Sequence, residues 1–590
     1  HQPMTDPVGG QTLVFNGEIY NFEALRDDLH AAGHTFDSSG DTAVLARLLA
    51  TEGTDACGHL RGMYAFATWD PASRRLTVAR DPHGIKPLYL CPNPDPEGEW
   101  SLLVASELRA ILASGLIGRP RLDPRAVASV VWNGYVAGPV TAVQGVSALP
   151  PGTVHTYDGR GREVGARTFW AMPSGGAAGS GTLHDLRTTL RDTVAAHLVA
   201  DVPLGVFLSG GVDSSAVANL AQRARPDQRV RTFALAFEED EYNEGHHARA
   251  VAEAIGTEHH EIVLTEGEFV AHLDEAIATL DQPTFDGLNS YFMSRTVREA
   301  GLTVALVGTG GDELFGGYTT FRDLPRLAAT VGRAARISPA LARRAAELFV
   351  RLKQRGDHGG LAPQSRWAKL PDMAAAGDDL LALYQLSYAL FLPSFQRELL
   401  ADDLGPGGPE ALVAQGGLAP ELRARITDEV RHHGTRSALS VMEQRCFLGE
   451  RLLPDTDAAS MAVSLELRLP LVDSVLTDQV GRLDAETRYE PVGRKQALRD
   501  VGLDGLDPAL FDRPKRGFEM PFDRWIRQNL GGQMDELMGD ASAAAAVGLD
   551  GAAVTRLWGA YRSGAPGIYW SRVWAVYILM RWCHAHGVLL

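Results

Sequence analysis

The stretch Ser209-Gly210-Gly211-Val212-Asp213-Ser214-Ser215 decides the fold prediction, because it joins a predicted strand (residues 205–208) to a predicted helix (residues 214–223). Two adjacent glycines let the backbone approach an anion closely, and the first turn of a helix offers free N–H groups and a positive dipole end. The serine hydroxyls add further donors. The pattern is typical of a phosphate-binding loop, and a serine-capped turn without a ligand is the plainer alternative.

A second loop predicts a metal ion at the same place. The sequence GTGGDELFGGY at residues 308–318 leaves the predicted strand at residues 303–307 and carries Asp312. Because the carboxyl ends of parallel strands meet at one edge of a sheet, Asp213 and Asp312 are predicted to face one polyphosphate. Carboxylates beside phosphates repel them unless Mg²⁺ lies between, so we expect the two residues to share one magnesium ion. No Walker motif occurs, which favours attack at the α-phosphate with pyrophosphate leaving.

The order of predicted elements divides the chain. After residue 183, strands alternate with helices, which predicts a parallel sheet with helices on both faces, and the chain beyond about residue 320 is predicted almost entirely helical. The first part has the short strands and helices of an α+β domain. The run PSGGAAGSG at residues 173–181 has the composition of a flexible linker. We therefore expect one domain over residues 1–165, a linker over 166–182 and a second domain over 183–590.

Composition excludes several classes of function. The formal net charge of −17 disfavours nucleic acids and anionic membranes as partners. The four cysteines have no paired spacing, so neither a disulfide framework nor a zinc site is expected, and a cytoplasmic protein is favoured. The apolar residues 568–583 contain two arginines, which predicts a buried helix and not a membrane span.

The chain resembles the class B, glutamine-hydrolysing asparagine synthetases over nearly its whole length. NGEIYN (16–21), GDT (40–42) and RDPHGIKPLY (80–89) resemble the glutaminase half of that family. The two loops resemble its synthetase signatures, and they are followed in the family's order by a helical signature, DAASMAVSLELRLP (457–470), by GRKQALR (493–499) and by PKRGF (514–518). The resemblance implies a partial N-terminal-nucleophile hydrolase-type sandwich. It is followed by a parallel-sheet ATP-pyrophosphatase (adenine nucleotide alpha hydrolase-like) domain with a helical C-terminal part.

The resemblance also implies roles in the second domain. Asp213 and Asp312 would bind magnesium, and Lys495 would stabilise charge on the α-phosphate during adenylation, although its own context is typical of a surface helix lysine. The residues implied in binding ATP and pyrophosphate are Phe207, Ser209, Gly210, Gly211, Asp213, Ser214, Ser215, Leu235, Val307 and Gly308.

In the first domain the resemblance implies a glutamine site. Asn16 and Gly17 would form an oxyanion hole, while Glu18 and Asp41 would hold the ammonium group of glutamine by charge-assisted hydrogen bonds. From the residues alone, Asn16-Gly17 is equally typical of a hairpin turn.

Two departures from the family pattern affect function. The family's glutaminase nucleophile is an N-terminal cysteine, and the printed chain opens at His1 beyond that position. Either the start is lost from this sequence or the natural protein lacks it. Cys57 and Cys91 stand in the wrong motif context to replace it, so the chain as printed is not expected to hydrolyse glutamine.

The second departure concerns the acceptor. Thr309 stands where family members that make asparagine carry an acidic residue tied to acyl-adenylate formation, and Val307 replaces a usual serine. Residues 284–290 also differ, in a region where the acceptor is expected to bind. The acceptor is therefore predicted to be aspartate or an analogue, with Lys495 and Thr309 as the candidate catalytic residues.

We predict an ATP- and Mg²⁺-dependent amide-forming ligase that uses a small carboxylate together with glutamine or ammonia, with a homodimer as one option for its assembly. An intramolecular amide-forming cyclase, resembling β-lactam synthetases or lasso-peptide cyclases with an idle first domain, is the alternative. A catalytically dead binding or regulatory protein is a third reading. Retention of Asp213, Asp312 and Lys495 argues against it.

Overall fold

The computed structural model of the chain describes residues 2–95, 97–175, 179–239, 245–353, 364–365, 367–512 and 520–590. Residues 176–178 of the predicted linker and the PKRGF motif at residues 514–518 lie outside the described residues.

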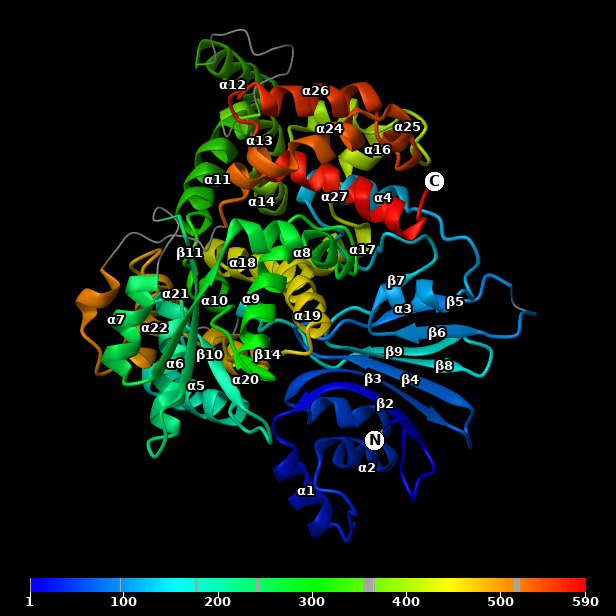
Figure 1. Ribbon diagram of the computed structural model, residues 1–590, viewed down its shortest axis with the longest axis vertical. Helices are drawn as coiled ribbons and strands as arrows, with labels where there is room; N and C mark the ends of the chain where they lie inside the picture. Colours follow the sequence, from blue (N-terminus) through cyan, green and yellow to red (C-terminus); the bar gives the residue numbers. More distant parts are fainter. Residues whose placement is uncertain are drawn as a thin grey trace.

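The first part of the chain forms two antiparallel sheets (Figure 1). The larger has the order β1-β2-β3-β4-β8-β9 and the smaller the order β6-β5-β7. Their strands are β1 (Met4–Thr5), β2 (Thr12–Ile19), β3 (Gly62–Asp70), β4 (Arg75–Arg80), β5 (Tyr89–Pro92), β6 (Leu102–Ala105), β7 (Ser147–Ala148), β8 (Thr153–Asp158) and β9 (Glu163–Thr168). Val78 and Leu90 belong to a buried apolar cluster that joins the two sheets, so the sheets pack face to face as a sandwich.

Helices cover the outer face of the larger sheet. α1 (Phe22–Ala31) and α2 (Asp41–Glu52) place Leu25 and Val44 in one buried cluster with Phe15 and Phe66 of the sheet. Burying the sheet on both faces requires apolar residues on both sides of its central strands, and β3 is buried over most of its length. The elements η1 (Gly53–Gly58), α3 (Leu108–Ala113) and α4 (Pro124–Asn133) complete this part of the chain.

The predicted parallel sheet is confirmed, with the order β12-β11-β10-β13-β14 and parallel pairing throughout. Its strands are β10 (Leu204–Phe207), β11 (Arg231–Phe237), β12 (Glu258–Leu264), β13 (Val304–Leu306) and β14 (Glu466–Arg468). Apolar clusters lie on both faces. One face packs against α5 (Leu183–His197), α6 (Val212–Ala224), α7 (Gly245–Ile255) and α22 (Gln496–Gly502), and the other against α9 (Gly287–Glu299) and α19 (Leu453–Ala462).

The sheet has a switch in strand order that marks a binding position. β11 and β12 lie on one side of β10, and β13 lies on the other side. Loops that leave the carboxyl ends of the strands diverge at such a point and open a crevice where ligands bind. The two predicted phosphate-site loops follow β10 and β13, so they flank this crevice.

The described part of the chain after residue 320 is almost entirely helical, as predicted, but β14 corrects the expectation of a helical motif at residues 457–470. Within that motif α19 ends at Ala462, and Ser464 adopts a φ of 60°, which interrupts the helix. Residues 466–468 then pair with β13, Leu306 opposite Arg468. The motif therefore begins in a helix and continues into a three-residue edge strand.

The remaining described elements are helical. Helix α27 (Trp570–His586), predicted from residues 568–583, is buried, with Trp574 and Trp582 fully enclosed. A helix able to span a bilayer is not found among the residues that the structure describes. The other elements are α8 (Glu266–Ala278), α10 (Gly311–Phe315), α11 (Thr320–Ile337), α12 (Pro339–Lys353), η3 (Trp367–Lys369), α13 (Leu370–Ala376), α14 (Leu380–Tyr388), α15 (Pro393–Leu399), α16 (Gly408–Ala414), α17 (Pro420–Val430), α18 (Thr435–Met442), η4 (Glu443–Leu452), η5 (Pro470–Val472), α20 (Ser474–Gly481), α21 (Ala485–Tyr489), η6 (Pro508–Phe511), α23 (Phe522–Trp525), η7 (Ile526–Leu530), α24 (Gly531–Gly539), α25 (Ala541–Ala546) and α26 (Gly551–Arg562).

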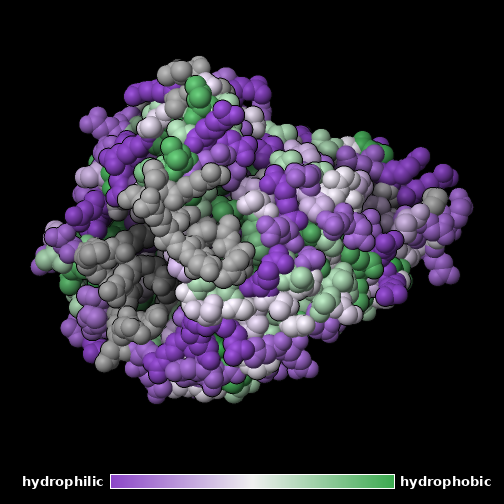
Figure 2. Space-filling view, turned by 90° about the horizontal axis from the view of Figure 1, so that it is seen from above, coloured by the Kyte–Doolittle hydropathy of each residue, from purple (hydrophilic) through white to green (hydrophobic). Residues whose placement is uncertain are grey.

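The surface seen from above mixes hydrophilic and hydrophobic residues (Figure 2). Hydrophobic residues form small patches among hydrophilic ones on this face, as expected where the large apolar side chains are enclosed.

Candidate active site

The first loop is a turn that only glycine fits. Gly210 has a φ of 70°, and a Cβ there would lie 2.9 Å from the backbone nitrogen of Ala248. The hydroxyl oxygens of Ser209 and Ser214 are 3.0 Å apart, so these two side chains brace the turn. The Ser215 side chain is fully buried, and its hydroxyl has no hydrogen-bond partner within the described part of the chain. The 13-residue helix α6 starts directly at this turn, which leaves its first N–H groups available to an anion.

The second loop is packed against the first. A Cβ on Gly308 would lie 2.5 Å from the nitrogen of Ser214, and one on Gly311 would lie 2.5 Å from Cγ of Asp213. Gly310 has a φ of 108°, a conformation that favours glycine. Each glycine therefore serves a close approach, and together they bring the carboxylates of both loops to one place.

Asp213, Asp312 and Lys495 converge on a single point. Nζ of Lys495 lies 2.6 Å from each carboxylate oxygen of Asp213 and 2.7 Å from Oδ1 of Asp312. Burial of Lys495 lowers its pKa, but the two carboxylates raise it more, so its pKa lies above the ordinary value and the side chain is charged. Three charged groups at one buried point carry a net charge of one negative unit, which suits an additional cation.

The backbone of Lys495 shows that its position is imposed by the fold. This residue has φ 52° and ψ 48° at the start of α22, in the left-handed region that side chains disfavour. Only 6% of the residue is exposed. A strained, buried lysine between two carboxylates excludes the surface-lysine alternative and is typical of a functional site.

The residues present fit a magnesium ion bound together with a nucleotide. No group of three or more His, Cys, Asp or Glu side chains able to hold a metal occurs among the described residues. Magnesium commonly takes one or two protein carboxylates and completes its octahedron with substrate phosphates and water. Asp213 and Asp312, beside a loop and helix N-terminus suited to an anion, supply that donor set.

The structure brings most of the predicted nucleotide-pocket residues together. Phe207 and Val307 lie at the carboxyl ends of adjacent strands and share one buried cluster with Phe233. Leu235 is half-buried in β11 and packs on a different cluster, so it lies beside this group and not within it. Thr309 is half-buried between the glycines of the second loop.

In the first domain the hairpin-turn alternative for Asn16-Gly17 is wrong, because both residues lie inside β2 opposite Ala65 and Tyr64 of β3. Gly17 has a φ of 141°, and a Cβ there would lie 2.8 Å from Cα of Tyr64. A glycine with an unusual backbone in mid-strand lets a neighbouring backbone come close, as a bulge or ligand-facing N–H would require.

Glu18 lies in that strand, and Asp41, the first residue of α2, accepts a hydrogen bond from the strand's backbone. Oδ2 of Asp41 accepts the N–H of Ile19 at 3.1 Å, and Oε2 of Glu18 lies 3.1 Å from the guanidinium of Arg468. Burial raises the pKa of Glu18 to about 7, against the lowering effect of Arg468 and with a further rise from Asp41. Burial also raises the pKa of Asp41. Two partly buried carboxylates with raised pKa values fit a cationic ligand group.

Sequence reasoning missed three charged residues near these sites. Arg468 stood in a quoted motif without a role, yet it joins the glutamine-site candidate to the parallel sheet. Burial raises the pKa of Glu313 to about 8 and that of Glu443 to about 7. Glu443 accepts hydrogen bonds from the hydroxyls of Thr320, Tyr384 and Tyr388. The available signal for Glu443 was a carboxylate that directly follows the mostly apolar residues 438–442.

All four cysteines are free and buried. Burial raises the pKa of Cys57 to about 12 and raises that of Cys91. Neither thiol is therefore activated as a nucleophile.

Comparison with known proteins relates both halves to families. Residues 1–170 match the model described as glutamine amidotransferase domain, and residues 185–584 match the model described as asparagine synthase. A putative glutamine-hydrolysing asparagine synthetase of Mycobacterium bovis is 32% identical, covering 99% of this chain and 86% of that protein. Glutamine-hydrolysing asparagine synthetase 1 of Bacillus subtilis is 28% identical, over 90% of this chain and 79% of that protein.

Solved structures align less well. Glutamine phosphoribosylpyrophosphate amidotransferase from B. subtilis covers 52% of this chain and 63% of its own at 18% identity, with a TM-score of 0.21 that supports no conclusion. The family matches, by contrast, span both halves of the chain in order. The chain belongs to the asparagine synthase family, and with its glutamine amidotransferase domain it is a glutamine-dependent carbon–nitrogen ligase of that type.

Proposed function

We propose that this chain uses ATP to adenylate a carboxylate, aspartate or an analogue, and transfers ammonia from glutamine to it, releasing AMP and pyrophosphate. The observation that carries the proposal is the convergence of Asp213, Asp312 and Lys495 at the switch point of the parallel sheet. The sequence has no Walker motif, the loop with which P-loop enzymes bind the phosphates of ATP for γ-phosphate transfer, and this favours attack at the α-phosphate.

Each group has a place in this reaction. The glycine turn at 210–211 and the first turn of α6 bind the pyrophosphate portion of ATP. Magnesium held by Asp213 and Asp312 would offset the negative charge of the triphosphate. With a metal ion on those carboxylates, Lys495 would be able to turn to the α-phosphate and stabilise the charge that builds there.

The reaction has two steps, adenylation of the acceptor and attack by ammonia. A carboxylate oxygen of the acceptor attacks the α-phosphorus, the bond to the bridging oxygen breaks, and pyrophosphate leaves. Ammonia then attacks the acyl carbon, AMP leaves with the bonding electrons, and the proton lost from nitrogen passes to solvent. Holding acceptor and nucleotide together contributes much of the rate, about 7–11 kcal/mol in well-oriented systems.

The first domain would bind the glutamine that supplies the ammonia, with the family's N-terminal cysteine, a position that the printed sequence does not reach, as the nucleophile. Glu18 and Asp41 bind the ammonium group of glutamine, and the polar groups of Asn16 and Gly17 polarise its amide carbonyl. The raised pKa values of Glu18 and Asp41 support their role in binding the ammonium group, since a bound cation favours the ionised carboxylates. The division into domains at 1–165 and 183–590, with a linker at 166–182, is part of this proposal.

Pyrophosphate exchange into ATP tests the adenylation step. We expect exchange that requires Mg²⁺ and a carboxylic acid, with aspartate tried first in a panel of analogues. Asp312→Asn should lower exchange by about 10²-fold or more, because it removes half of the metal's protein ligands. Asp428→Asn, at an exposed aspartate, is the matched control. Full exchange in Asp312→Asn would remove Asp312 from the metal site.

A further inference from the structure

The aromatic side chains that reach the surface gather at one end of the molecule. Among the described residues three aromatic side chains are exposed, those of Phe349, Trp367 and Tyr569, and Leu341 and Leu348 are exposed beside them. The exposed fractions of these five residues run from 40% for Phe349 to 63% for Tyr569. Large apolar side chains exposed together mark an interaction surface more often than a bare one. We call these five residues the aromatic end.

Contacts join the aromatic residues into one surface. The ring centres of Phe349 and Trp367 are 5.9 Å apart. Three residues before Trp367, the carbonyl of Gln364 accepts a hydrogen bond from Nη2 of Arg572 at 3.0 Å. The guanidinium carbon of Arg572 lies 5.2 Å from the centre of the Tyr569 ring. Helix α12, the short helix η3 and the chain before α27 thus present one continuous surface.

On α12 the apolar and basic side chains follow the spacing of one helical face. Leu348 and Phe349 are seven and eight residues beyond Leu341, which places all three on one side of a helix. Arg344 stands three residues after Leu341 and four before Leu348, so it borders the same side. Arg344 is exposed and makes no ion pair within the described residues. The face therefore combines apolar side chains with an unpaired positive charge.

The charge of this part of the chain is opposite to that of the whole. Residues 320–353 contain eight Lys or Arg residues and two Asp or Glu residues, whereas the whole chain has a formal net charge of −17. Glu347 offsets Arg343 at 3.0 Å. Arg333 of α11 is exposed and, like Arg344, forms no ion pair with a described residue. An anionic surface would supply the missing negative charge.

The aromatic end lies at a tip of the molecule. Figure 1 shows α12 at one end of the longest axis and α1 toward the opposite end. A tip can meet a flat surface without obstruction by the rest of the chain. Figure 2, which looks down on this end, shows hydrophobic residues directly beside hydrophilic ones.

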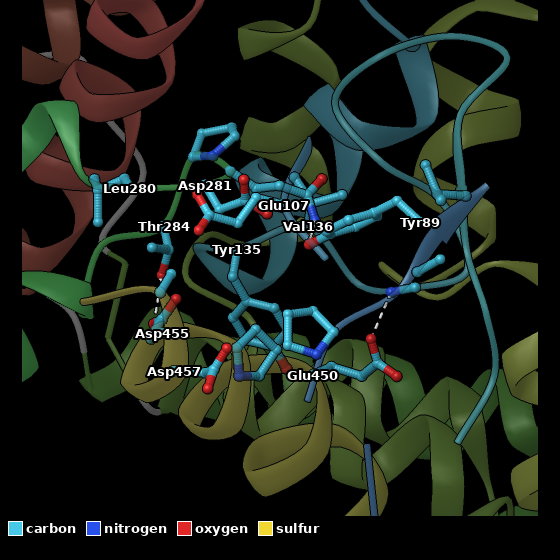
Figure 3. Close-up of a pocket in the computed structure, with 18 of the residues that line it drawn as sticks. Tyr89, Glu107, Tyr135, Val136, Leu280, Asp281, Thr284, Glu450, Asp455 and Asp457 are labelled. Atoms are coloured by element: carbon cyan, nitrogen blue, oxygen red, sulfur yellow. Dashed lines mark hydrogen bonds between the residues drawn. The ribbon is translucent and has the colours of Figure 1, made fainter. Parts of the chain in front are cut away.

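The carboxyl groups of the internal cavity have partners within the chain, in contrast to these arginines. That cavity lies between the two halves of the chain (Figure 3). Asp455 accepts the hydroxyl of Thr284 at 2.8 Å, and Glu450 accepts the N–H of Gly138 at 2.6 Å. Asp281 is hydrogen-bonded as well. These groups need no ligand, so the unmatched chemistry lies at the aromatic end.

We propose that the aromatic end binds the surface of an anionic lipid bilayer. Leu348, Phe349 and Trp367 enter the boundary between head groups and acyl chains, and Arg333 and Arg344 face the lipid phosphates. Trp and Tyr favour that boundary, because their rings are apolar while their N–H and O–H groups stay hydrated. A helix with an apolar face bordered by arginine lies there in the plane of the membrane.

The net negative charge of the chain does not prevent this contact. Charges on lipid and protein act over about a Debye length, roughly 8–10 Å, so the basic residues of α11 and α12 decide the attraction when this end approaches. The inference goes beyond the ligase reaction and does not depend on it.

Sedimentation of the full chain with lipid vesicles tests the proposal. One set of vesicles is phosphatidylcholine with an equal amount of phosphatidylglycerol, and the other is phosphatidylcholine alone. We expect binding to the mixed vesicles that is about tenfold tighter or more than to phosphatidylcholine, and that weakens as salt is added. Failure to bind the mixed vesicles, or equal binding to both kinds, would overturn the assignment.

Variants of the apolar side chains connect binding to the aromatic end. Leu348→Ser with Trp367→Ser should weaken binding to the mixed vesicles about tenfold or more, because less apolar surface leaves water. Leu116→Ser with Val164→Ser, at two exposed positions in the first half of the chain, is the matched control and should bind as the parent chain does. Circular dichroism checks folding, and if the double variant is unfolded, Leu348→Ser alone must weaken binding. Unchanged binding in a folded variant would contradict the proposal.

A charge variant tests the role of arginine separately. Arg344→Gln should weaken binding to the mixed vesicles about fivefold, the usual effect of one basic residue near an anionic bilayer, and leave binding to phosphatidylcholine unchanged. Arg431→Gln, at an exposed arginine outside this end, should alter neither. Equal effects of the two substitutions would remove Arg344 from the surface that meets the lipid.

Light scattering distinguishes a bilayer from a second copy of the chain as the occupant. We expect the double variant Leu348→Ser with Trp367→Ser to have the same mass in solution as the parent chain. A parent dimer that this variant dissociates would make the aromatic end an interface between copies and overturn the membrane assignment.

Discussion

At the scale of single residues, the candidate active site depends on glycines that allow carboxylates to approach backbone. A methyl group at position 311 would lie 2.5 Å from Cγ of Asp213. We predict that Gly311→Ala displaces Asp213 and lowers pyrophosphate exchange by about 10²-fold, since small displacements in a site have effects of that size. The far-ultraviolet circular dichroism spectrum should be unchanged.

Gly532→Ala is the control for that prediction, because a Cβ at position 532 would have no neighbour within 4 Å. It should leave exchange unaltered. If Gly311→Ala retained full exchange, the close packing of the two loops would have no role in the reaction.

Because the pKa of Glu18 is raised, we predict that the affinity for glutamine depends on pH. Its pKa of about 7 in the folded chain lies above the ordinary value of 4.5. Ionising this buried carboxyl therefore costs stability as the pH rises from 4.5 to 7, and a bound ammonium group recovers part of that cost. Glutamine affinity measured by calorimetry should rise about tenfold between pH 6 and pH 8, as the ionised fraction grows.

Glu18→Gln is the test variant for this titration, because it cannot ionise. This variant should bind glutamine weakly, and its affinity for glutamine should change little with pH. An equal rise in affinity in that variant would assign the titration to another group, of which Asp41 is the nearest candidate.

The sequence allowed a site residue to be predicted where its neighbours in the chain indicate its chemistry. The anion-binding turn and the pairing of Asp213 with Asp312 followed from glycine and carboxylate positions at strand ends. The place of Lys495 did not, because its burial and left-handed backbone result from packing between α22 and the second loop, 180 residues away in the chain. Its local context indicated a surface lysine, and only the resemblance to a family marked it.

At the scale of elements, β14 connects the two candidate sites. Its Arg468 lies 3.1 Å from Glu18 through the side chain, and its backbone carbonyl accepts the N–H of Val307 at 3.0 Å. Because Arg468 lowers the pKa of Glu18, Arg468→Met should move the midpoint of glutamine binding to higher pH. Arg431→Met, at an exposed arginine, should not move it.

If the pH dependence of glutamine affinity still has its midpoint near pH 7 in Arg468→Met, this arginine has no electrostatic effect on Glu18. The folded state of the variant is checked by its melting temperature, since loss of a buried charge partner costs about 3–5 kcal/mol.

The short strands β10 and β13 were predicted because each is an apolar run that ends at a glycine-containing loop. Length alone did not decide the outcome, since the 13-residue helix α8 was not predicted. β14 has only three residues and follows directly on a helix, so no pattern of period two could develop. The π-helical turn η4 was equally invisible, because it differs from an α-helix in hydrogen bonding and not in composition.

At the scale of the whole molecule, buried ion pairs hold the two halves together. Nζ of Lys86 lies 2.6 Å from Oδ1 of Asp457, with 2% and 11% of the side chains exposed. We predict that Lys86→Met destabilises the chain by about 3–5 kcal/mol, because Asp457 is left as a buried charge without this partner. Melting temperature and the rate of limited proteolysis both report the loss.

The double variant Lys86→Met with Asp457→Leu separates charge from packing. Replacing both members of a buried pair by apolar residues is often neutral, so most of the lost stability should return. A double variant as unstable as Lys86→Met would contradict the electrostatic explanation.

The order of the two folds was predictable from the sequence, whereas their contact was not. The parallel sheet followed from element spacing, whereas the sandwich was implied by the resemblance to a known family. The cavity between the halves depends on residues 80–148 meeting residues 280–284 and 450–458, and nothing in local sequence predicts that meeting. Domain boundaries remain a prediction for the same reason.

The most direct test of the central claim is a crystal structure with Mn²⁺ and a non-hydrolysable ATP analogue, using anomalous scattering to locate the metal. We predict an ion about 2.0–2.3 Å from carboxylate oxygens of both Asp213 and Asp312 and from a phosphate oxygen, with Lys495 turned to the α-phosphate. An ion bound elsewhere, or Lys495 still between the two aspartates with the nucleotide present, would contradict the account.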